Sequence, residues 1–237
     1  MNLLLLQPQD LVSETRAMIQ GPRLQHLQEI LKASIGDRLN VGLLNGLMGQ
    51  ARIESLENNQ ATLSFTLDQP PPAALPLTVV LALPRPKMLK RILKNIAELG
   101  IKQLYLINSY KVEKSYWQTP WLSDEKIHEC LLEGLVQARD TQLPQVQLKR
   151  LFKPFVEDEL PALIEGKEAF IAHPYQAQPM PPASNAERLV VIGPEGGFIP
   201  YEVSLLQQQG LHPICMGERI YRVENALTLL STQLSHV

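Results

Sequence analysis

A run of prolines divides the chain into two segments and constrains its fold more than any other feature. Three consecutive prolines begin at Pro70, and Pro76 follows shortly after them. Proline has no backbone N–H and a fixed φ, so this run can form neither a helix nor a central strand and indicates a stiff linker. We therefore predict a first domain over residues 1–70, a linker over 71–76 and a second domain over 77–237.

The first segment alternates apolar and polar residues, as short strands do. Leu39, Val41 and Leu43 alternate in this way and are followed by the pair Asn45-Gly46. That pair is typical of a type I′ hairpin turn, so we expect a return strand directly after it.

One helix interrupts the strands of the first segment. Pro22 suits a first helical position, and apolar residues recur at helical spacing after it, at Leu24, Leu27, Ile30 and Leu31. Several short strands with one helix in about 70 residues fit a small β-barrel.

The second segment alternates strands with helices, which predicts a parallel sheet covered on both faces. A continuous apolar strand occupies residues 77–83, and an apolar stripe of helical period between Met88 and Leu99 ends at Gly100, which suits the end of a helix. Further strands are predicted at residues 103–107, 146–151, 169–172, 189–192 and 212–216, and further helices at 127–139 and 225–234.

The positive charge of the chain is concentrated in one place. With 22 basic and 24 acidic residues the net charge is −2, which does not indicate a nucleic-acid partner. Between Arg85 and Lys114, however, eight basic residues face two acidic ones, a local charge of +6. Lys87, Arg91 and Lys94 lie opposite the apolar stripe, so they either meet the phosphates of a polyanion or form a solvated helix face.

Composition excludes several classes of protein. No apolar run approaches the roughly 20 residues of a membrane span, and the apolar residues near the start lack the pattern of a secretory signal. The two cysteines, Cys130 and Cys215, are too few for a disulfide framework and fit a reducing compartment. The five histidines are scattered without metal-ligand spacing. We expect a cytoplasmic protein with no membrane partner and no metal.

Two glycine-containing loops are the candidates for chemistry. A buried strand runs into Gly193-Pro194-Glu195-Gly196-Gly197, where glycine allows positive φ and close approach of a ligand to the main chain. A second strand leads through Met216-Gly217 to two arginines and two carboxylates before the last helix. Tight strand-to-helix turns and an ordinary helix N-terminus are the alternative interpretations.

Taken together, these loops resemble the RsmE family of the SPOUT methyltransferase superfamily. The resemblance rests on Gly193-Pro194-Glu195-Gly196-Gly197-Phe198, Glu202 and Met216-Gly217-x-Arg219-Ile220-x-Arg222-Val223-Glu224. It extends to Arg23-x-x-His26-Leu27, Gly36-Asp37, Lys87, Glu98-Leu99-Gly100, Gln137-x-Arg139 and His173-Pro174, and so spans nearly the whole chain. Members of this family methylate N3 of uridine in 16S ribosomal RNA and use S-adenosylmethionine.

The resemblance implies an α/β fold in which a small N-terminal PUA-like β-barrel precedes a SPOUT methyltransferase domain with a C-terminal trefoil knot. It also implies a homodimer whose active site lies at the subunit interface. The barrel is expected to bind RNA, and 16S ribosomal RNA or the assembled small subunit is the expected partner. The cofactor would contact backbone groups of Ala172, His173, Ile192, Gly193, Pro194, Glu195, Gly196, Met216, Gly217, Ile220, Tyr221, Arg222 and Val223.

We also expect roles for individual side chains. We expect Arg139 and Arg222 to hold phosphate or stabilise developing negative charge, and Glu224 to be the carboxylate near the reacting base. RNA contacts are expected from Arg23, His26, Arg85, Lys87, Arg91 and Lys94.

Two departures from the family pattern leave other functions open. Val136 stands where a glutamate is common, and Asn225 where threonine is usual. One alternative is therefore an RNA-binding protein with impaired catalysis that keeps the methyltransferase fold. A nucleotide-binding α/β regulator without RNA affinity is the other.

Overall fold

A computed structural model of the protein describes residues 2–175 and 177–236, which form two compact units. The first unit extends to Ala73 and also takes in Leu132–Leu143. The second contains Ala74–Leu131 and the residues from Pro144 onward. Residues 70–76 form neither helix nor strand, as their prolines dictate.

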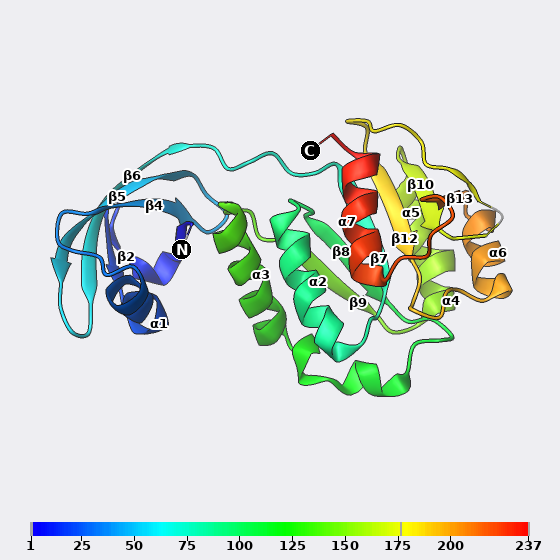
Figure 1. Ribbon diagram of the computed structural model, residues 1–237, viewed down its shortest axis with the longest axis horizontal. Coiled ribbons are helices and arrows are strands. Elements are labelled where there is room, and N and C mark those ends of the chain that lie inside the picture. Colours follow the sequence, from blue (N-terminus) through cyan, green and yellow to red (C-terminus); the bar gives the residue numbers. More distant parts are fainter. Residues whose placement is uncertain (1, 176, 237) are drawn as a thin grey trace. The chain divides into compact units, whose positions relative to one another are not determined.

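The first unit is built on one mixed six-stranded sheet (Figure 1). Its strands are β1 (Leu4–Leu6), β2 (Leu11–Ser13), β3 (Arg16–Ile19), β4 (Arg38–Leu43), β5 (Met48–Leu56) and β6 (Ala61–Gln69), in the order β1-β4-β5-β6-β3-β2. Only the β1–β4 pair among these is parallel. The alternation of buried and exposed residues along β5 and β6 directs one face of the sheet into an apolar core around Ile53, Leu63 and Phe65.

The hairpin between β4 and β5 has a longer turn than predicted. The N–H of Gly46 donates to the carbonyl of Leu43 at 2.7 Å, and the N–H of Leu43 donates to the carbonyl of Leu47 at 2.9 Å. Asn45 has φ of 60°, but Gly46 is not in the left-handed region. A type I′ turn requires positive φ at both central residues, so the predicted turn type is wrong, although the return strand is where we expected it.

The predicted helix of the first unit is shorter and less regular than expected. A single α-helical turn, α1 (Gly21–Gln25), continues as a π-helical segment, η2 (His26–Ile30). The π geometry takes more residues per turn than an α-helix, so residues three and four beyond Leu27 do not return to its buried face. Ile30 is therefore 67% exposed, and its assignment to the apolar stripe is wrong.

The second unit contains a seven-stranded sheet whose described strand pairs are all parallel. Its order is β11-β13-β10-β12-β7-β8-β9, with β7 (Leu77–Ala82), β8 (Gln103–Ile107), β9 (Gln145–Lys149), β10 (Glu168–Ala172), β11 (Gln178–Pro179), β12 (Arg188–Ile192) and β13 (His212–Cys215). The central strands β7 and β12 are buried along their full length, which matches their uninterrupted apolar sequences.

Helices α2 (Pro86–Glu98) and α7 (Val223–Leu234) lie side by side, and α7 contacts β12. The apolar stripe of α2 is buried at Leu89, Ile92 and Ile96, and Gly100 has φ of 74°, so the predicted helix and its glycine end are confirmed. The other helices are α3 (Asp124–Ala138), α4 (Phe152–Pro154), α5 (Leu160–Ile164) and α6 (Pro200–Gln208), with a π segment, η5 (Phe155–Glu159), between α4 and α5. Short 3-10 turns are η1 (Pro8–Asp10), η3 (Lys114–Gln118) and η4 (Pro120–Leu122). The helices between Phe152 and Ile164 and helix α6 were missed by the sequence analysis.

Candidate active site

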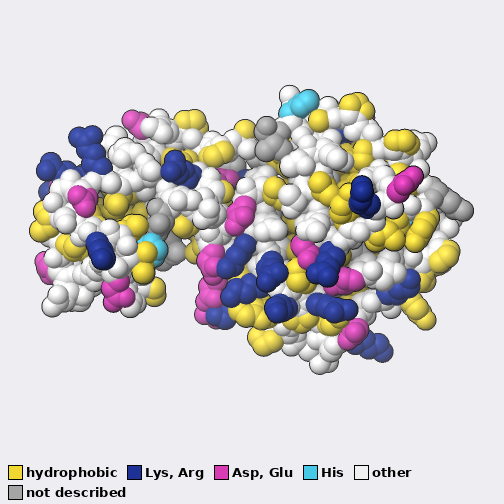
Figure 2. All heavy atoms as spheres, viewed as in Figure 1, with side chains coloured by type: hydrophobic (Ala, Val, Ile, Leu, Met, Phe, Trp, Pro, Cys, Tyr) yellow, Lys and Arg dark blue, Asp and Glu magenta, His cyan; other side chains and the backbone are white. Residues whose placement is uncertain are grey.

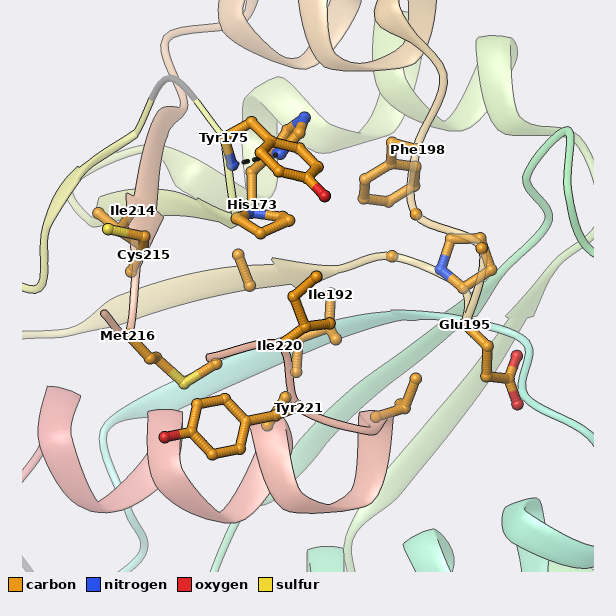
Figure 3. A pocket seen from close by; sticks show the side chains of 18 of the residues that line it. His173, Tyr175, Ile192, Glu195, Phe198, Ile214, Cys215, Met216, Ile220 and Tyr221 are labelled. Atoms are coloured by element: carbon orange, nitrogen blue, oxygen red, sulfur yellow. Dashed lines mark hydrogen bonds between the residues drawn. The ribbon is translucent and has the colours of Figure 1, made fainter. Parts of the chain in front are cut away.

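A cavity of about 310 Å³ opens where the neighbouring strands β13, β10 and β12 end. Parallel strands bring their carboxyl ends to one edge of a sheet, so the loops after these strands converge although they are far apart in the sequence. Twelve residues predicted to bind the cofactor line this cavity: Ala172, His173, Ile192, Gly193, Pro194, Glu195, Gly196, Met216, Gly217, Ile220, Tyr221 and Val223. In Figure 3, His173 and Tyr175 lie on one side of the cavity, and Met216 and Tyr221 lie on the other side, beside α7.

The loop after β12 needs glycine for two reasons, close packing at one position and a positive φ at another. A Cβ atom on Gly193 would lie 3.1 Å from the ring of Phe198, so a side chain there would push the ring away. Among the glycines of this loop only Gly197 has positive φ, at 68°. Gly193 is therefore needed for space and Gly197 for conformation.

Glu202 fixes this loop to the loop that follows β8. It is 2% exposed and lies in the first turn of α6, where a carboxylate is favoured by the helix dipole. The backbone N–H groups of Tyr110 and Ile199 donate to its two carboxylate oxygens at 2.7 Å and 3.0 Å, and the Ser109 hydroxyl donates at 3.3 Å. A buried charge with several donors holds both loops in one geometry.

The loop after β13 leaves its main chain available to a ligand. Among the described residues, no backbone N–H or C=O of residues 217–221 has a hydrogen-bond partner. Gly217 has φ of 93°, and the Ile220 side chain is 73% exposed. Because main-chain groups need hydrogen-bond partners once they are covered, this loop suits a ligand that brings both apolar surface and polar atoms.

His173 provides the titratable side chain on the opposite wall of the cavity. The N–H of Tyr175 donates to its Nδ1 at 3.3 Å. Partial burial lowers the pKa of His173 below its ordinary value, so the imidazole is neutral at pH 7. A neutral imidazole does not repel a cationic ligand.

Charged side chains lie against the glycine loop that lines the cavity. The Nζ of Lys111 donates to the carbonyl of Gly196 at 2.6 Å, and Arg85 lies 3.9 Å from the carboxylate of Glu195. Partial burial and the negative charge of Glu113 raise the pKa of Tyr116, against the opposing effect of Arg85. A Cβ atom on Gly196 would lie 2.9 Å from Cδ of Lys111, so this glycine makes room for the lysine.

The residues expected to be catalytic lie outside the cavity lining. Arg222 is the N-cap of α7 and is exposed, and Glu224 lies in the first turn of that helix. Both flank Val223, which lines the cavity. Arg139 belongs to the first unit and has φ of 56°. Their catalytic roles, and cofactor binding by Arg222, stay proposals.

The residues expected to bind RNA differ in how far their side chains are engaged within the protein. Both terminal nitrogens of Arg23 donate to the buried carboxylate of Asp10, each at 2.6 Å, which leaves little of the guanidinium for a phosphate. His26 is half-buried, and its Nε2 has no hydrogen-bond partner among the described residues. On α2, Lys87 and Arg91 are exposed, as is Arg85 before it, whereas Lys94 is half-buried and interacts with a neighbour.

The described residues contain neither a cluster of metal ligands nor a membrane-spanning helix. No group of three or more His, Cys, Asp or Glu side chains there could hold a metal ion. Within the same part of the chain, no helix is long and apolar enough to cross a membrane.

Glu202, Lys111 and Phe198 are the site residues whose contacts the sequence analysis did not foresee. The sequence did carry a signal for Glu202, because Pro200 followed two residues later by a glutamate is typical of a helix N-terminus. Nothing in the sequence indicated that Lys111 would contact a loop 85 residues away.

Comparisons with known proteins agree with this geometry. Residues 71–235 match the family model described as an RNA methyltransferase domain. The ribosomal RNA small subunit methyltransferase E of Treponema pallidum is 28% identical over 232 residues, which cover 95% of this chain and 87% of that protein. The protein of the same name from Synechocystis is 26% identical over 240 residues, covering 98% and 76%.

A solved structure has the same fold. It is that of a ribosomal RNA small subunit methyltransferase E from Neisseria gonorrhoeae bound to S-adenosyl methionine, with a TM-score of 0.74 at 17% identity over 98% of this chain and 95% of that one. The predicted α/β methyltransferase fold agrees with this match, and the resemblance to the RsmE family is confirmed by the family model and the named relatives. Because the family model covers well over half of the sequence, the chain belongs to the RNA methyltransferase family.

Proposed function

We propose that this protein transfers a methyl group from S-adenosylmethionine to N3 of a uridine in small-subunit ribosomal RNA. The observation that carries the proposal is the cavity at the ends of β10, β12 and β13, built from the loops of a chain in the RNA methyltransferase family. The names of the relatives support methyl transfer and the small-subunit ribosomal RNA substrate, whereas N3 of uridine rests on the resemblance to the RsmE family. The bound ligand of the Neisseria structure supports the cofactor.

The residues of the cavity fit this cofactor. Its volume of about 310 Å³ lies in the range of small-molecule sites. The apolar side chains of Ile192, Met216 and Ile220 suit the faces of an adenine ring, and the main chain of residues 217–221 offers donors and acceptors to the polar atoms. When bound, S-adenosylmethionine supplies an electrophilic methyl group on a sulfonium sulfur.

The protein's own contribution is mainly to hold the reactants in line. Uridine N3 carries a proton that must leave, and the loops at 193–197 and 216–222 contain no histidine to accept it. Positioning should therefore supply most of the rate. Arg222 and Glu224 flank Val223, which lines the cavity, and are proposed to stabilise negative charge and to accept a hydrogen bond. Arg139 is proposed to hold phosphate.

The substrate RNA is proposed to lie along a basic face around α2. Uridine N3 takes part in base pairing, so the base must be unpaired or extruded when it is methylated. Figure 2 shows Lys and Arg side chains gathered over α2, where Lys87 and Arg91 are exposed opposite the buried Leu89 and Ile92. Packing does not explain these cations, whereas contact with phosphates does.

Charge reversal tests this face. The variant Lys87→Glu/Arg91→Glu should lose RNA affinity, and its salt dependence should flatten by up to about one unit of slope per lost phosphate contact. Cofactor affinity should stay unchanged, because neither residue lines the cavity. Lys153→Glu reverses an exposed cation of the same unit that lies on α4 instead of α2; it is the control and should bind RNA normally. An unchanged salt slope in the double variant would make this a solvated helix face only.

The C-terminal third is proposed to form the trefoil knot that the family resemblance implies. The chain leaves β13, which lies beyond β10, and returns to α7, which packs on β12. Its loop therefore passes the loop that follows β12, and both line one cavity. Arg188 ties the connection between β10 and β12 to the end of α7 through the carbonyls of Pro182 and Leu234.

The protein is further proposed to be a homodimer whose active site lies at the subunit interface. Within each chain, residues 1–70 are proposed to form an RNA-binding PUA-like β-barrel, residues 71–76 the linker and residues 77–237 the methyltransferase domain. The mixed six-stranded sheet and its apolar core support an independently packed first domain. Light scattering that shows a monomer at micromolar concentration would contradict both the dimer and the shared site.

Transfer of labelled methyl groups tests the proposed function. The purified protein, supplied with methyl-labelled S-adenosylmethionine, should label the RNA of small ribosomal subunits that lack the modification and should not label fully modified subunits. A protein that binds both RNA and cofactor without transferring label would be the impaired RNA-binding protein considered above. One that binds the cofactor but no RNA would be a nucleotide-binding regulator.

A further inference from the structure

Tyr110 is presented to solvent by a loop that is otherwise firmly held. Its side chain is 79% exposed, the largest value among the exposed large hydrophobic side chains described. Ser109 on one side is buried, and so is Val112 two residues further on. Single exposed apolar residues are common, so exposure alone says nothing. The informative feature is the rigidity of the backbone that carries this ring.

That backbone is fixed by the buried carboxylate of Glu202, which accepts the N–H of Tyr110 at 2.7 Å. The N–H of Val112 donates to the carbonyl of Ser109 at 3.0 Å and closes a turn around Tyr110. A ring on such a turn loses little conformational entropy when a flat ligand packs on it, which favours binding.

Positively charged side chains and the cavity lie close to Tyr110 in the structure. The next residue, Lys111, lines the cavity and donates to the carbonyl of Gly196. Lys114 is exposed at the start of η3, directly after this loop, and Arg85 lies beside Glu195, which lines the cavity. Proteins that bind single strands combine cations for the backbone with aromatic rings on which bases stack, and both occur here beside the cavity.

We propose that Tyr110 is a positioning residue for the substrate RNA, on which an unpaired base next to the reacting uridine stacks. The inference rests on the proposed function, because it requires an RNA strand that enters this cavity. Stacking on Tyr110 would hold the strand open, so that the neighbouring uridine is free to reach the methyl donor.

Binding of a short oligouridine to the full-length protein tests the proposal. Tyr110→Ala should weaken oligouridine affinity by about 5- to 100-fold, the usual effect of losing one stacked base, and Tyr110→Phe should stay within about twofold of the wild type. The dependence of oligouridine affinity on salt concentration should be unchanged in both variants, because stacking releases no counterions. In Lys87→Glu/Arg91→Glu this dependence should become weaker. Tyr201→Ala removes another exposed tyrosine, on α6, and should have no effect.

Several results would overturn the proposal. One is an oligouridine affinity of Tyr110→Ala equal to that of the wild type. Another is an equal loss of this affinity in Tyr110→Ala and Tyr110→Phe, and a third is failure of the wild type to bind oligouridine. A shift of Tyr110→Ala to a smaller oligomer in light scattering would assign the ring to a contact between two copies of the chain instead. Methyl transfer to small subunits is measured separately, so loss of the proposed function and loss of this inference remain distinguishable.

Discussion

Removing the Glu202 carboxylate should both destabilise the second unit and weaken cofactor binding. In Glu202→Ala the backbone N–H groups of Tyr110 and Ile199 lose their acceptor in a buried setting. Hydrogen bonds to a charged group are each worth about 1.5–3 kcal/mol, and two that share one carboxylate are not fully additive. We therefore expect the free energy of unfolding to fall by about 3–4 kcal/mol, a large share of the ~5–15 kcal/mol typical of a domain.

Tryptophan fluorescence during guanidinium unfolding measures this loss. Both tryptophans of the chain, Trp117 and Trp121, belong to the second unit, so the signal reports on that unit alone. Glu157→Ala, which breaks an exposed pair with Lys153, is the matched control and should cost less than about 1 kcal/mol. A loss below about 1 kcal/mol in Glu202→Ala, or unchanged cofactor affinity in calorimetry, would refute the anchoring role.

Three further predictions concern the cavity and the first unit. Gly196→Val should weaken cofactor binding at least tenfold in calorimetry, because a branched side chain would displace Lys111 from the cavity mouth. Unchanged cofactor affinity in a folded variant would contradict this role of Gly196. Because the pKa of His173 is lowered in the folded protein, the unfolded chain binds the proton more readily below pH 6.5, and the free energy of unfolding should fall as the pH decreases through this range. The decrease should be smaller in His173→Gln, and an equal pH dependence of the two proteins would contradict the prediction. Asp10→Ala should destabilise the first unit by about 3 kcal/mol, because it leaves the partly buried Arg23 without its partner. An unchanged melting temperature in circular dichroism would disprove this prediction.

The regular elements of the second unit could be predicted because local patterns determine them. The apolar run of β7, the stripe of α2 and the glycine that ends it are each visible within a few residues. In the first unit, the π-helical geometry after Gln25 and the longer turn at Asn45 depend on tertiary packing, which periodicity does not encode.

In the candidate site, too, some features could be predicted from local sequence and others depend on the tertiary structure. The glycine loops could be recognised from their composition, and twelve of the thirteen residues expected to bind cofactor do line the cavity. The roles of Lys111 and Glu202 could not be predicted, because each joins loops that only the strand order brings together. Residues 132–143 group with the first unit although they lie far beyond the prolines, which no linear division of the sequence could show.

The chemical identity of the methylated nucleoside tests the central claim most directly. Small ribosomal subunits lacking the modification would be incubated with the protein and S-adenosylmethionine, and their RNA digested to nucleosides and analysed by mass spectrometry. The account predicts one new product, 3-methyluridine, which Glu202→Ala forms more slowly. Methylation at another atom or base, or no product from a folded protein that binds the cofactor, would contradict it.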